Sequence, residues 1–377
     1  MEKLNFFEFS LKELEDFVVE KGHKSFRARQ LFQWVYAFGV TEVEEMTNLS
    51  KAFRHELVDW FDFILPTMMS ERISQIDGTR KYLFDVGKNL SIETVMIPSE
   101  GRNTLCVSSE VGCNLACRFC FTGKQKLKKR LRASEIVGQF INVKKSLPQD
   151  IPLTNIVFMG MGEPLDNEIE VFKAIDILTE DLGINLSRKK ITVSTSGLVD
   201  KIPLVTRAGV RLAVSLNGSD DITRDYVMPI NKKWNIQTLL QACREHAKQS
   251  RDKVTLEYVL LKGVTDSLDD AKRLVKIARQ VPCKVNIIPF NEHPGSGFER
   301  PSERSIQQFQ NFLIQHDVHV LRRKTMGRDI YAACGQLNSV HQAQKQKIEE
   351  GVPVLMEKGR SFGLGSSQEI PPLNSFN

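Results

Sequence analysis

From about residue 100 onward, short apolar runs alternate with longer stretches in which apolar residues recur at helical spacing. Runs that are apolar throughout predict strands of a parallel sheet that is buried on both faces. Six such strands are predicted, at 104–108, 156–159, 191–194, 210–216, 254–261 and 285–290. A helix is predicted after each strand, at 134–145, 168–182, 199–207, 237–249, 267–280 and 303–316.

The alternation predicts an α/β fold class built from six strand–helix units. A complete barrel of eight units takes about 250 residues, and a count of six favours a partial (βα)6 barrel. A doubly wound parallel sheet is the alternative, because the sequence does not fix the order of the strands. Both folds place the active site at the carboxyl ends of the strands.

The chain before this alternation follows a different pattern. The helical stretch after Ser25 places four apolar residues near one face: Phe26, Leu31, Trp34 and Val35. Segment 81–97 predicts two strands around a turn at 87–89.

We therefore expect three regions. Residues 1–95 form an N-terminal accessory domain, helical and then extended, and residues 96–345 form the catalytic barrel. Residues 346–377 are rich in Gly, Ser and Pro and are expected to be a flexible tail.

Composition and charge narrow the class of protein. The chain is 41% hydrophobic and 26% charged, which excludes a mostly disordered or fibrous protein. No apolar run reaches the ~18–20 residues of a membrane span, and the first residues lack the pattern of a secretion signal, so we expect a cytoplasmic protein. Residues 1–95 carry 12 Lys+Arg and 16 Asp+Glu, and the overall charge of +6 leaves +10 for the rest, which fits a polyanionic partner.

Three closely spaced cysteines carry the strongest chemical signal. Cys113, Cys117 and Cys120 directly follow the first predicted strand of the barrel. In a reducing compartment such cysteines favour metal or redox chemistry over a disulfide framework. A closed zinc site takes four ligands, and no further Cys or His lies nearby. Three thiolates on a [4Fe–4S] cluster leave one iron open to a substrate or cofactor.

Other predicted strands also end in residues suited to a ligand. Gly162 permits close approach of the backbone, and Glu163 offers a carboxylate to an ammonium group. Small or polar positions follow at the ends of three further strands: Ser194, Ser215, Leu216, Asn217 and Asn291. Any one could cap a turn, but their recurrence at corresponding strand ends indicates a common site.

The spacing C-x₃-C-x₂-C, with Phe119 before the last cysteine, resembles the radical S-adenosylmethionine (SAM) superfamily. The resemblance implies that Cys113, Cys117 and Cys120 hold a [4Fe–4S] cluster whose open iron binds SAM. An electron from the cluster then cleaves SAM to a 5′-deoxyadenosyl radical. By the same resemblance, two residues bind the methionine amino group and five bind its carboxylate and the ribose: Gly162 and Glu163, then Ser194, Ser215, Leu216, Asn217 and Asn291.

Two further cysteines narrow the resemblance. Cys106, on the first strand, and Cys334, within 327–337, accompany the Met-Gly-Met-Gly-Glu-Pro-Leu stretch and Ile-Glu-Thr-Val at 92–95. Together these motifs resemble the RlmN/Cfr family of RNA adenine methyltransferases over about residues 5–345.

This resemblance implies a sequence of reactions. Cys334 takes a methyl group from one SAM. A radical from a second SAM removes a hydrogen atom from that methyl group, and the resulting methylene adds to the adenine. Glu93 is the base implied for the adenine proton. Cys106 then attacks the sulfur of Cys334, which releases the product and leaves a Cys106–Cys334 disulfide.

The implied substrates are 23S rRNA, at an adenosine of the peptidyl-transferase centre, and tRNA, at the adenosine 3′ to the anticodon. A flavodoxin-like electron donor is also implied, and we expect a monomer. Pro164 favours the C2-methylating RlmN branch over the C8-methylating Cfr branch. The rival interpretations are a radical-SAM enzyme acting on another substrate, such as a protein, and an RNA-binding iron–sulfur sensor.

Basic residues cluster beside both reactive segments. Residues 124–132 hold six Lys or Arg in nine positions, and 322–324 with Arg328 precede Cys334. Such runs are either solvated surface or phosphate contacts, and their position next to the reactive cysteines favours phosphate contacts.

Overall fold

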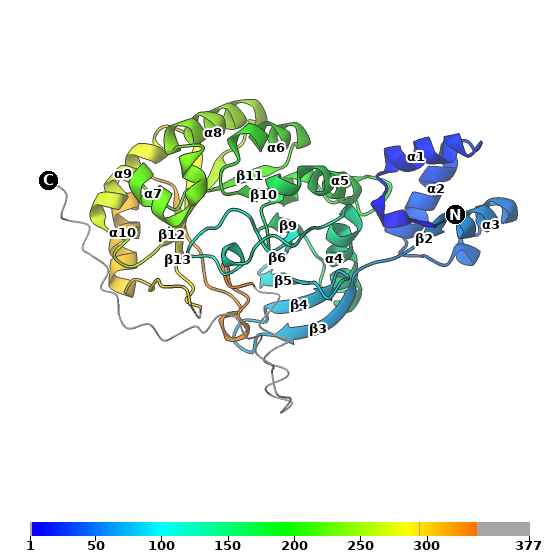
Figure 1. Cartoon of the computed structure of the whole chain (residues 1–377), viewed down its shortest axis with the longest axis horizontal. Coiled ribbons are helices and arrows are strands. Elements are labelled where there is room, and N and C mark those ends of the chain that lie inside the picture. Colours follow the sequence, from blue (N-terminus) through cyan, green and yellow to red (C-terminus); the bar gives the residue numbers. More distant parts are fainter. Residues whose placement is uncertain (1, 294, 338–377) are drawn as a thin grey trace. The chain divides into compact units, whose positions relative to one another are not determined.

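A ten-stranded sheet organises the protein, whose computed structural model describes residues 2–293 and 295–337 (Figure 1). The strand order is β14-β13-β12-β11-β10-β9-β6-β5-β4-β3. The strands are β3 (Thr67–Ile73), β4 (Arg80–Asp85), β5 (Ser91–Ser99), β6 (Arg102–Cys106), β9 (Asn155–Phe158), β10 (Ile191–Thr195), β11 (Arg211–Ser215), β12 (Val254–Leu260), β13 (Cys283–Pro289) and β14 (Val320–Arg322).

The seven strands from β6 to β14 are parallel, and neighbours in the sheet are neighbours in the chain. A doubly wound sheet reverses its strand order at a switch point, so this order excludes that alternative. The partial barrel of six strand–helix units is confirmed, with β14 as an additional parallel strand that the sequence did not predict.

Helices cover the outside of the parallel strands (Figure 1). They are α4 (Ala133–Ser146), α5 (Glu168–Thr179), α6 (Ile202–Ala208), α8 (Ile236–Ser250), α9 (Leu268–Ala278) and α10 (Glu303–Gln315). A further short helix, α7 (Asp221–Val227), follows β11 and contacts the cysteine loop. Of these helices, only α7 was not predicted. A short antiparallel ribbon of β7 (Glu110–Val111) and β8 (Lys129–Arg130) was also missed.

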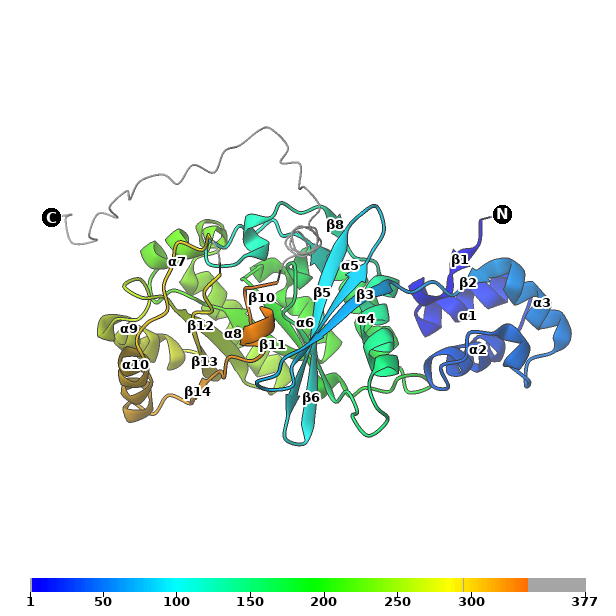
Figure 2. The same cartoon turned by 90° about the horizontal axis from the view of Figure 1, so that it is seen from below.

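The strands β5, β4 and β3 extend the same sheet beyond β6, and each of them is antiparallel to the strand before it in the sheet (Figure 2). The predicted pair of strands in 81–97 corresponds to β4 and β5. The expected domain boundary after residue 95 falls inside β5, and the division of the chain into three regions stays a prediction. The expected tail, 346–377, lies outside the described residues.

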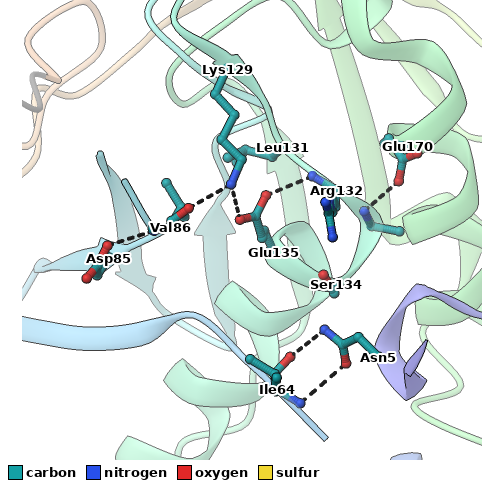
Figure 3. Close-up of polar contacts among 12 residues, drawn as sticks. Asn5, Ile64, Asp85, Val86, Lys129, Leu131, Arg132, Ser134, Glu135 and Glu170 are labelled. Atoms are coloured by element: carbon teal, nitrogen blue, oxygen red, sulfur yellow. Dashed lines mark hydrogen bonds and ion pairs between the residues drawn. The ribbon is translucent and has the colours of Figure 1, made fainter. Parts of the chain in front are cut away.

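Residues 2–62 contain three α-helices and a short parallel pair of strands: α1 (Leu11–Glu20), α2 (Phe26–Tyr36), α3 (Lys51–Trp60), β1 (Leu4–Asn5) and β2 (Phe61–Asp62). The Asn5 side chain donates to the Ile64 carbonyl at 2.9 Å and accepts from its N–H at 3.3 Å (Figure 3). In α2, Leu31 and Val35 are buried as predicted. Phe26 is exposed instead, and Phe32 takes its place in the core.

A buried glutamine joins the antiparallel strands to the barrel. The Oε1 of Gln139, on α4, accepts from Thr94 Oγ1 at 2.7 Å and from Ser108 N at 2.8 Å. Its Nε2 donates to the Ser108 carbonyl at 3.0 Å and to the Glu135 carbonyl at 3.2 Å. The side chain is fully buried, so water cannot replace these bonds.

We therefore expect Gln139→Met to lower the stability of the protein by about 2–4 kcal/mol, because it leaves several buried polar groups without partners. The melting temperature of the metal-free protein, followed by circular dichroism, measures this. Gln280→Met, at an exposed site, is the matched control and is expected to change stability by less than about 0.5 kcal/mol. Equal melting temperatures for the two variants would contradict the role given to Gln139.

Candidate active site

One pocket opens at the carboxyl ends of the parallel strands, as the fold predicts. Ten of the thirteen site residues that the sequence predicted line it: Cys113, Cys117, Cys120, Gly162, Glu163, Ser194, Ser215, Asn217, Asn291 and Cys334. The other three, Glu93, Cys106 and Leu216, do not line this pocket and are buried nearby in the fold. Sites far apart in the sequence therefore converge on one cavity.

The loop that carries the three cysteines is fixed by backbone contacts. Cys113 N donates to the Gln125 carbonyl at 3.0 Å, and Arg118 N donates to the Val227 carbonyl at 3.0 Å. A Cβ at Gly123 would lie 2.7 Å from the carbonyl oxygen of Cys117, so only glycine permits this close turn. The loop thus presents the cysteines from a defined backbone.

The donor set fits an iron–sulfur cluster better than a single metal ion. Within 2–293 and 295–337, no three His, Cys, Asp or Glu side chains lie close enough to hold one ion. A mononuclear zinc site would need its thiolates about 4 Å apart, whereas each thiolate of a [4Fe–4S] cluster binds a different iron. Cys113, Cys117 and Cys120 would hold the cluster. Burial raises the pKa of each thiol, so cluster binding must supply the free energy of deprotonation.

The turn after β9 presents Glu163 to the pocket. Burial raises the pKa of Glu163, an effect that hydrogen bonds to its carboxylate partly offset. Its Oε2 accepts from the backbone N of Ser196 at 2.8 Å and from the hydroxyl at 2.5 Å. A buried carboxylate held in this way can take the ammonium group of an amino acid. Ser196 and Thr195 line the pocket beside the predicted Ser194, within the same Ser-Thr-Ser-Gly stretch.

The carboxyl group of Glu110 supports the turn that carries Glu163. Glu110 is fully buried, and its Oε2 accepts from the backbone N of Glu163 at 2.9 Å. Gly162 has φ +98°, and a Cβ there would lie 2.5 Å from the Cβ of Glu110. Burial, with smaller contributions from Asp166 and Glu163, raises the pKa of Glu110 to about 8. No sequence pattern indicates Glu110, because its role depends on contact with a turn that is distant in the chain.

A buried arginine ties two strand ends together. Arg224, on α7, has no exposed surface. Its guanidinium donates to the carbonyls of Ser196 at 2.7 Å, Leu216 at 2.9 Å and Ser215 at 3.2 Å, and to Asn231 Oδ1 at 2.8 Å. Burial lowers its pKa only to about 10, so the group stays charged at neutral pH. One side chain therefore fixes the loops after β10 and β11.

Glu257, on β12, is another pocket residue that the sequence did not indicate. Its Oε1 accepts from Asn286 Nδ2 at 3.1 Å. Its Oε2 is buried and has no hydrogen-bond partner among the described residues. The nearest cation is Arg323, whose Nη1 lies 4.0 Å away. This oxygen lies in the pocket wall, is buried and lacks a hydrogen-bond donor within the described part of the chain. It therefore suits a ligand that carries hydroxyl or ammonium donors, as SAM does.

The segment that carries Cys334 is docked on the rim of the barrel. The Cys334 carbonyl accepts from Asn291 Nδ2 at 3.3 Å, and the Gly335 carbonyl accepts from Phe121 N at 2.8 Å. Thr122 Oγ1 donates to the Leu337 carbonyl at 2.9 Å. These bonds join the segment to the end of β13 and to the cysteine loop, which places Cys334 in the same pocket wall as Cys120.

Cys106 and Cys334 are both free thiols and share one cationic neighbour. Arg323, just after β14, interacts electrostatically with both sulfurs and with Glu257. Burial, with a smaller effect of Cys334, raises the pKa of Cys106 to about 12, and Arg323 opposes this rise. In the sequence Arg323 is part of a basic run, whereas the structure places it in the pocket wall.

Glu93 lies on β5, next to the strand of Cys106. It is buried, and its Oε1 forms an ion pair with Lys81 Nζ at 3.0 Å. Lys81 Nζ also donates to the Tyr331 carbonyl at 3.1 Å. The carboxylate is therefore linked through one lysine to the segment that carries Cys334, and its role as a base stays a prediction.

Part of the basic run at 124–132 has a structural role. Lys129 Nζ donates to the Val86 carbonyl at 2.6 Å and to Glu135 Oε1 at 2.5 Å (Figure 3). Arg130 Nη2 pairs with Asp166 at 2.8 Å. Lys126 and Lys128 are exposed and form no ion pair within the described part of the chain. The hypothesis of phosphate contact therefore applies first to Lys126 and Lys128.

Comparison with known proteins assigns the fold and site to a class. Residues 4–61 match the family Ribosomal RNA large subunit methyltransferase N-terminal domain, and residues 107–275 match the Radical SAM superfamily. The solved structure of a radical SAM methyltransferase from Sphaerobacter thermophilus is 38% identical, with a TM-score of 0.82, over 89% of this chain and 99% of that one. The chain is thus a radical SAM enzyme, a class that uses a [4Fe–4S] cluster and SAM.

Curated relatives define the family more closely. A protein of Bdellovibrio bacteriovorus is 58% identical over 89% of this chain and 84% of its own length. A protein of Geobacter sulfurreducens is 47% identical over 89% and 92%. Both are named dual-specificity RNA methyltransferase RlmN. The chain belongs to the RlmN family, which confirms the resemblance that the motifs indicated. No helix in the described ranges is long and apolar enough to cross a membrane.

Replacing Arg224 by methionine is expected to weaken SAM binding about tenfold or more. The variant leaves buried carbonyls at the ends of β10 and β11 without donors, at a cost of about 1–3 kcal/mol each. Equilibrium dialysis of SAM with the anaerobically reconstituted protein measures the affinity. Arg279→Met, at the exposed end of α9, is the control, and a folded Arg224→Met protein with unchanged affinity would refute the prediction.

Glu110→Gln is expected to stabilise the protein more at pH 8 than at pH 5. The pKa of Glu110 in the folded protein is about 8, above the ordinary value of 4.5. Between pH 4.5 and pH 8, the carboxyl group therefore keeps its proton in the folded protein but loses it in the unfolded chain. Stability conferred by this group is present below about pH 4.5 and falls as the pH rises toward 8, by at most about 1.4 kcal/mol per pH unit. Glutamine cannot ionise, so the variant does not lose this stability as the pH rises. The melting temperatures of wild type and Glu110→Gln between pH 5 and pH 8 test the prediction.

Proposed function

We propose that the chain methylates C2 of adenosine in 23S rRNA, within the peptidyl-transferase centre, and in tRNA, 3′ to the anticodon. The named activity of its RlmN relatives supports this proposal. The observation that carries the mechanism is the position of Cys334 in one pocket wall with the three cluster cysteines, beside an arginine that it shares with Cys106. An iron–sulfur sensor would need neither of these two additional cysteines.

The reaction needs more than methyl displacement, because C2 of adenine is an electron-poor carbon and a weak nucleophile. When bound, the cluster and SAM supply the methyl group and the one-electron chemistry that removes a hydrogen atom. The protein positions SAM. Glu163 and the loops that Arg224 fixes hold its amino acid portion. Glu257 offers a further acceptor in the pocket wall. We infer that two SAM molecules are consumed for each methyl group transferred.

Cys334 is the proposed carrier of the methyl group. A thiolate is a suitable nucleophile toward SAM, and the docked segment keeps this sulfur within the pocket. Arg323 stabilises negative charge on the sulfur before methylation. Once methylated, the sulfur is a neutral thioether, and its methyl carbon is the atom that becomes joined to the adenine.

Cys106 is the proposed resolving thiol. Its thiolate attacks the Cys334 sulfur, and a disulfide forms between the two cysteines. The electron pair of the broken sulfur–carbon bond stays on the product carbon, which takes up a proton to become the methyl group. The high pKa of Cys106 keeps it protonated at first, and Arg323 favours the thiolate when the attack occurs. Two electrons must then reduce the disulfide. We propose that a flavodoxin-like protein supplies the electrons to a monomeric enzyme.

Glu93 is the proposed base for the C2 proton. Its ion pair with Lys81, and the bond from Lys81 to the Tyr331 carbonyl, would couple its position to the Cys334 segment.

Cys334→Ala is expected to abolish methyl transfer, because no sulfur remains to carry the methyl group. The protein is incubated anaerobically with SAM, a reductant and unmodified 23S rRNA or tRNA, and the digested nucleosides are analysed by mass spectrometry. Cys106→Ala is expected to form little free product and to accumulate a covalent protein–RNA adduct. Cys283→Ala, at the far end of β13, is the matched cysteine control and is expected to keep the wild-type rate.

The methylated nucleoside that is formed distinguishes methylation at C2 from methylation at C8. 2-Methyladenosine supports the proposed function, and 8-methyladenosine would keep the mechanism but change the carbon that is methylated. Methyl transfer that survives in Cys334→Ala would overturn the mechanism.

A further inference from the structure

A second hollow lies beside the active-site pocket, and we call it the flanking pocket. Arg300, Arg328 and Tyr331 contribute to its wall. Phe290 and Asn291 line both cavities, so a single layer of residues separates them. A ligand that enters the active-site pocket as one unit of a polymer can therefore place its neighbouring unit in the flanking pocket.

One cation in this wall is available to a ligand. The guanidinium of Arg300 donates to the carbonyls of Pro289 and Phe290 and to Glu303, so it mainly builds the wall. The acidic side chain of the wall, Glu292, accepts from the backbone N of Arg300 at 3.0 Å. Arg328 is exposed and forms no ion pair with any residue of 2–293 and 295–337. An exposed arginine at the rim of a pocket is suited to bind a phosphate.

An aromatic side chain is held beside this arginine. Tyr331 is 46% exposed and has φ +52°, a left-handed conformation that is uncommon for a bulky residue. Contacts from the loop between β3 and β4 maintain it. Asp329 accepts from Ser74 Oγ at 2.7 Å, and Asp77 accepts from Gly327 N at 2.8 Å. Strain that the surroundings maintain near an active site favours a functional role for the residue.

We propose that the flanking pocket binds the nucleotide next to the target adenosine, with its base stacked on Tyr331 and its phosphate paired with Arg328. The proposal rests on the proposed function, since it requires RNA as the substrate. A base must be turned out of its stack to reach the active-site pocket, which leaves its neighbour in need of a new stacking partner. Stacking on an aromatic ring tolerates any base. The same pocket therefore suits both an rRNA and a tRNA substrate.

Fluorescence anisotropy with the wild-type holoenzyme and a labelled stem-loop RNA that contains the target adenosine tests the proposal. Tyr331→Asn keeps a residue that tolerates the left-handed conformation but removes the ring, and we expect it to weaken binding about five- to 100-fold. Tyr331→Phe keeps the ring and is expected to stay within about twofold of wild type. The KM for RNA should rise in Tyr331→Asn by much more than kcat falls, because the contact is made before and during the reaction.

Arg328→Ala is expected to reduce by about one the slope of log affinity against log salt concentration, as the loss of one phosphate contact requires. Arg279→Ala, at an exposed site directly after α9, is the matched control and should leave the slope unchanged. An unchanged slope in Arg328→Ala would overturn the phosphate contact.

RNA lacking the base on one side of the target identifies the stacked nucleotide. Two RNAs are compared, one abasic on the 5′ side of the target adenosine and one abasic on the 3′ side. On the RNA that lacks the stacked base, wild type and Tyr331→Asn should have equal affinity, because no base remains to stack on the ring. If Tyr331→Asn binds both RNAs more weakly than wild type by the same factor, the proposed stacking is wrong. Normal RNA affinity in Tyr331→Asn with slower reduction by an electron-donor protein would assign the pocket to that donor instead. Wild-type protein that neither binds nor methylates RNA would refute the proposed function itself.

Discussion

The parallel pairing of seven strands in chain order is the constraint on which the site depends. Because each strand runs in the same direction as its neighbour, every carboxyl end reaches the same rim, and every loop that follows a strand begins there. Cysteines after β6, the glycine–glutamate turn after β9 and the polar ends of β10, β11 and β13 are thereby brought into one pocket. A doubly wound sheet would have divided these loops at a switch point.

Ionisable groups buried at this rim are held by fixed protein groups instead of water. Glu163 is bound by Ser196, and Glu110 binds the backbone of Glu163. Arg224 satisfies three carbonyls, and Arg323 faces Glu257 and two thiols. Removing such groups from water is costly, and the cost is offset only when their partners are correctly placed. The same contacts that satisfy them therefore set the geometry into which the substrate must fit.

The antiparallel strands before the barrel take part in the site as well. The loop between β3 and β4 binds the turn at 327–331, β4 supplies Lys81, and β5 supplies Glu93. The segment that carries Cys334 is thus held from the cysteine loop, from the end of β13 and from these strands. Cys334 is in this way given a fixed place in the pocket.

The sequence by itself determined the six strand–helix units, the cysteine motif and the strand-end residues, because each depends on periodicity or spacing within a short segment. Those signals also indicated the family. Only the tertiary structure decided the roles of Glu110, Arg224, Glu257 and Arg323, each of which contacts residues from another part of the chain. The sequence presented Arg323 as one charge in a basic run and Glu257 as one polar residue in an apolar strand. Their positions in the pocket wall follow from strand register and burial, which no local pattern of residues records.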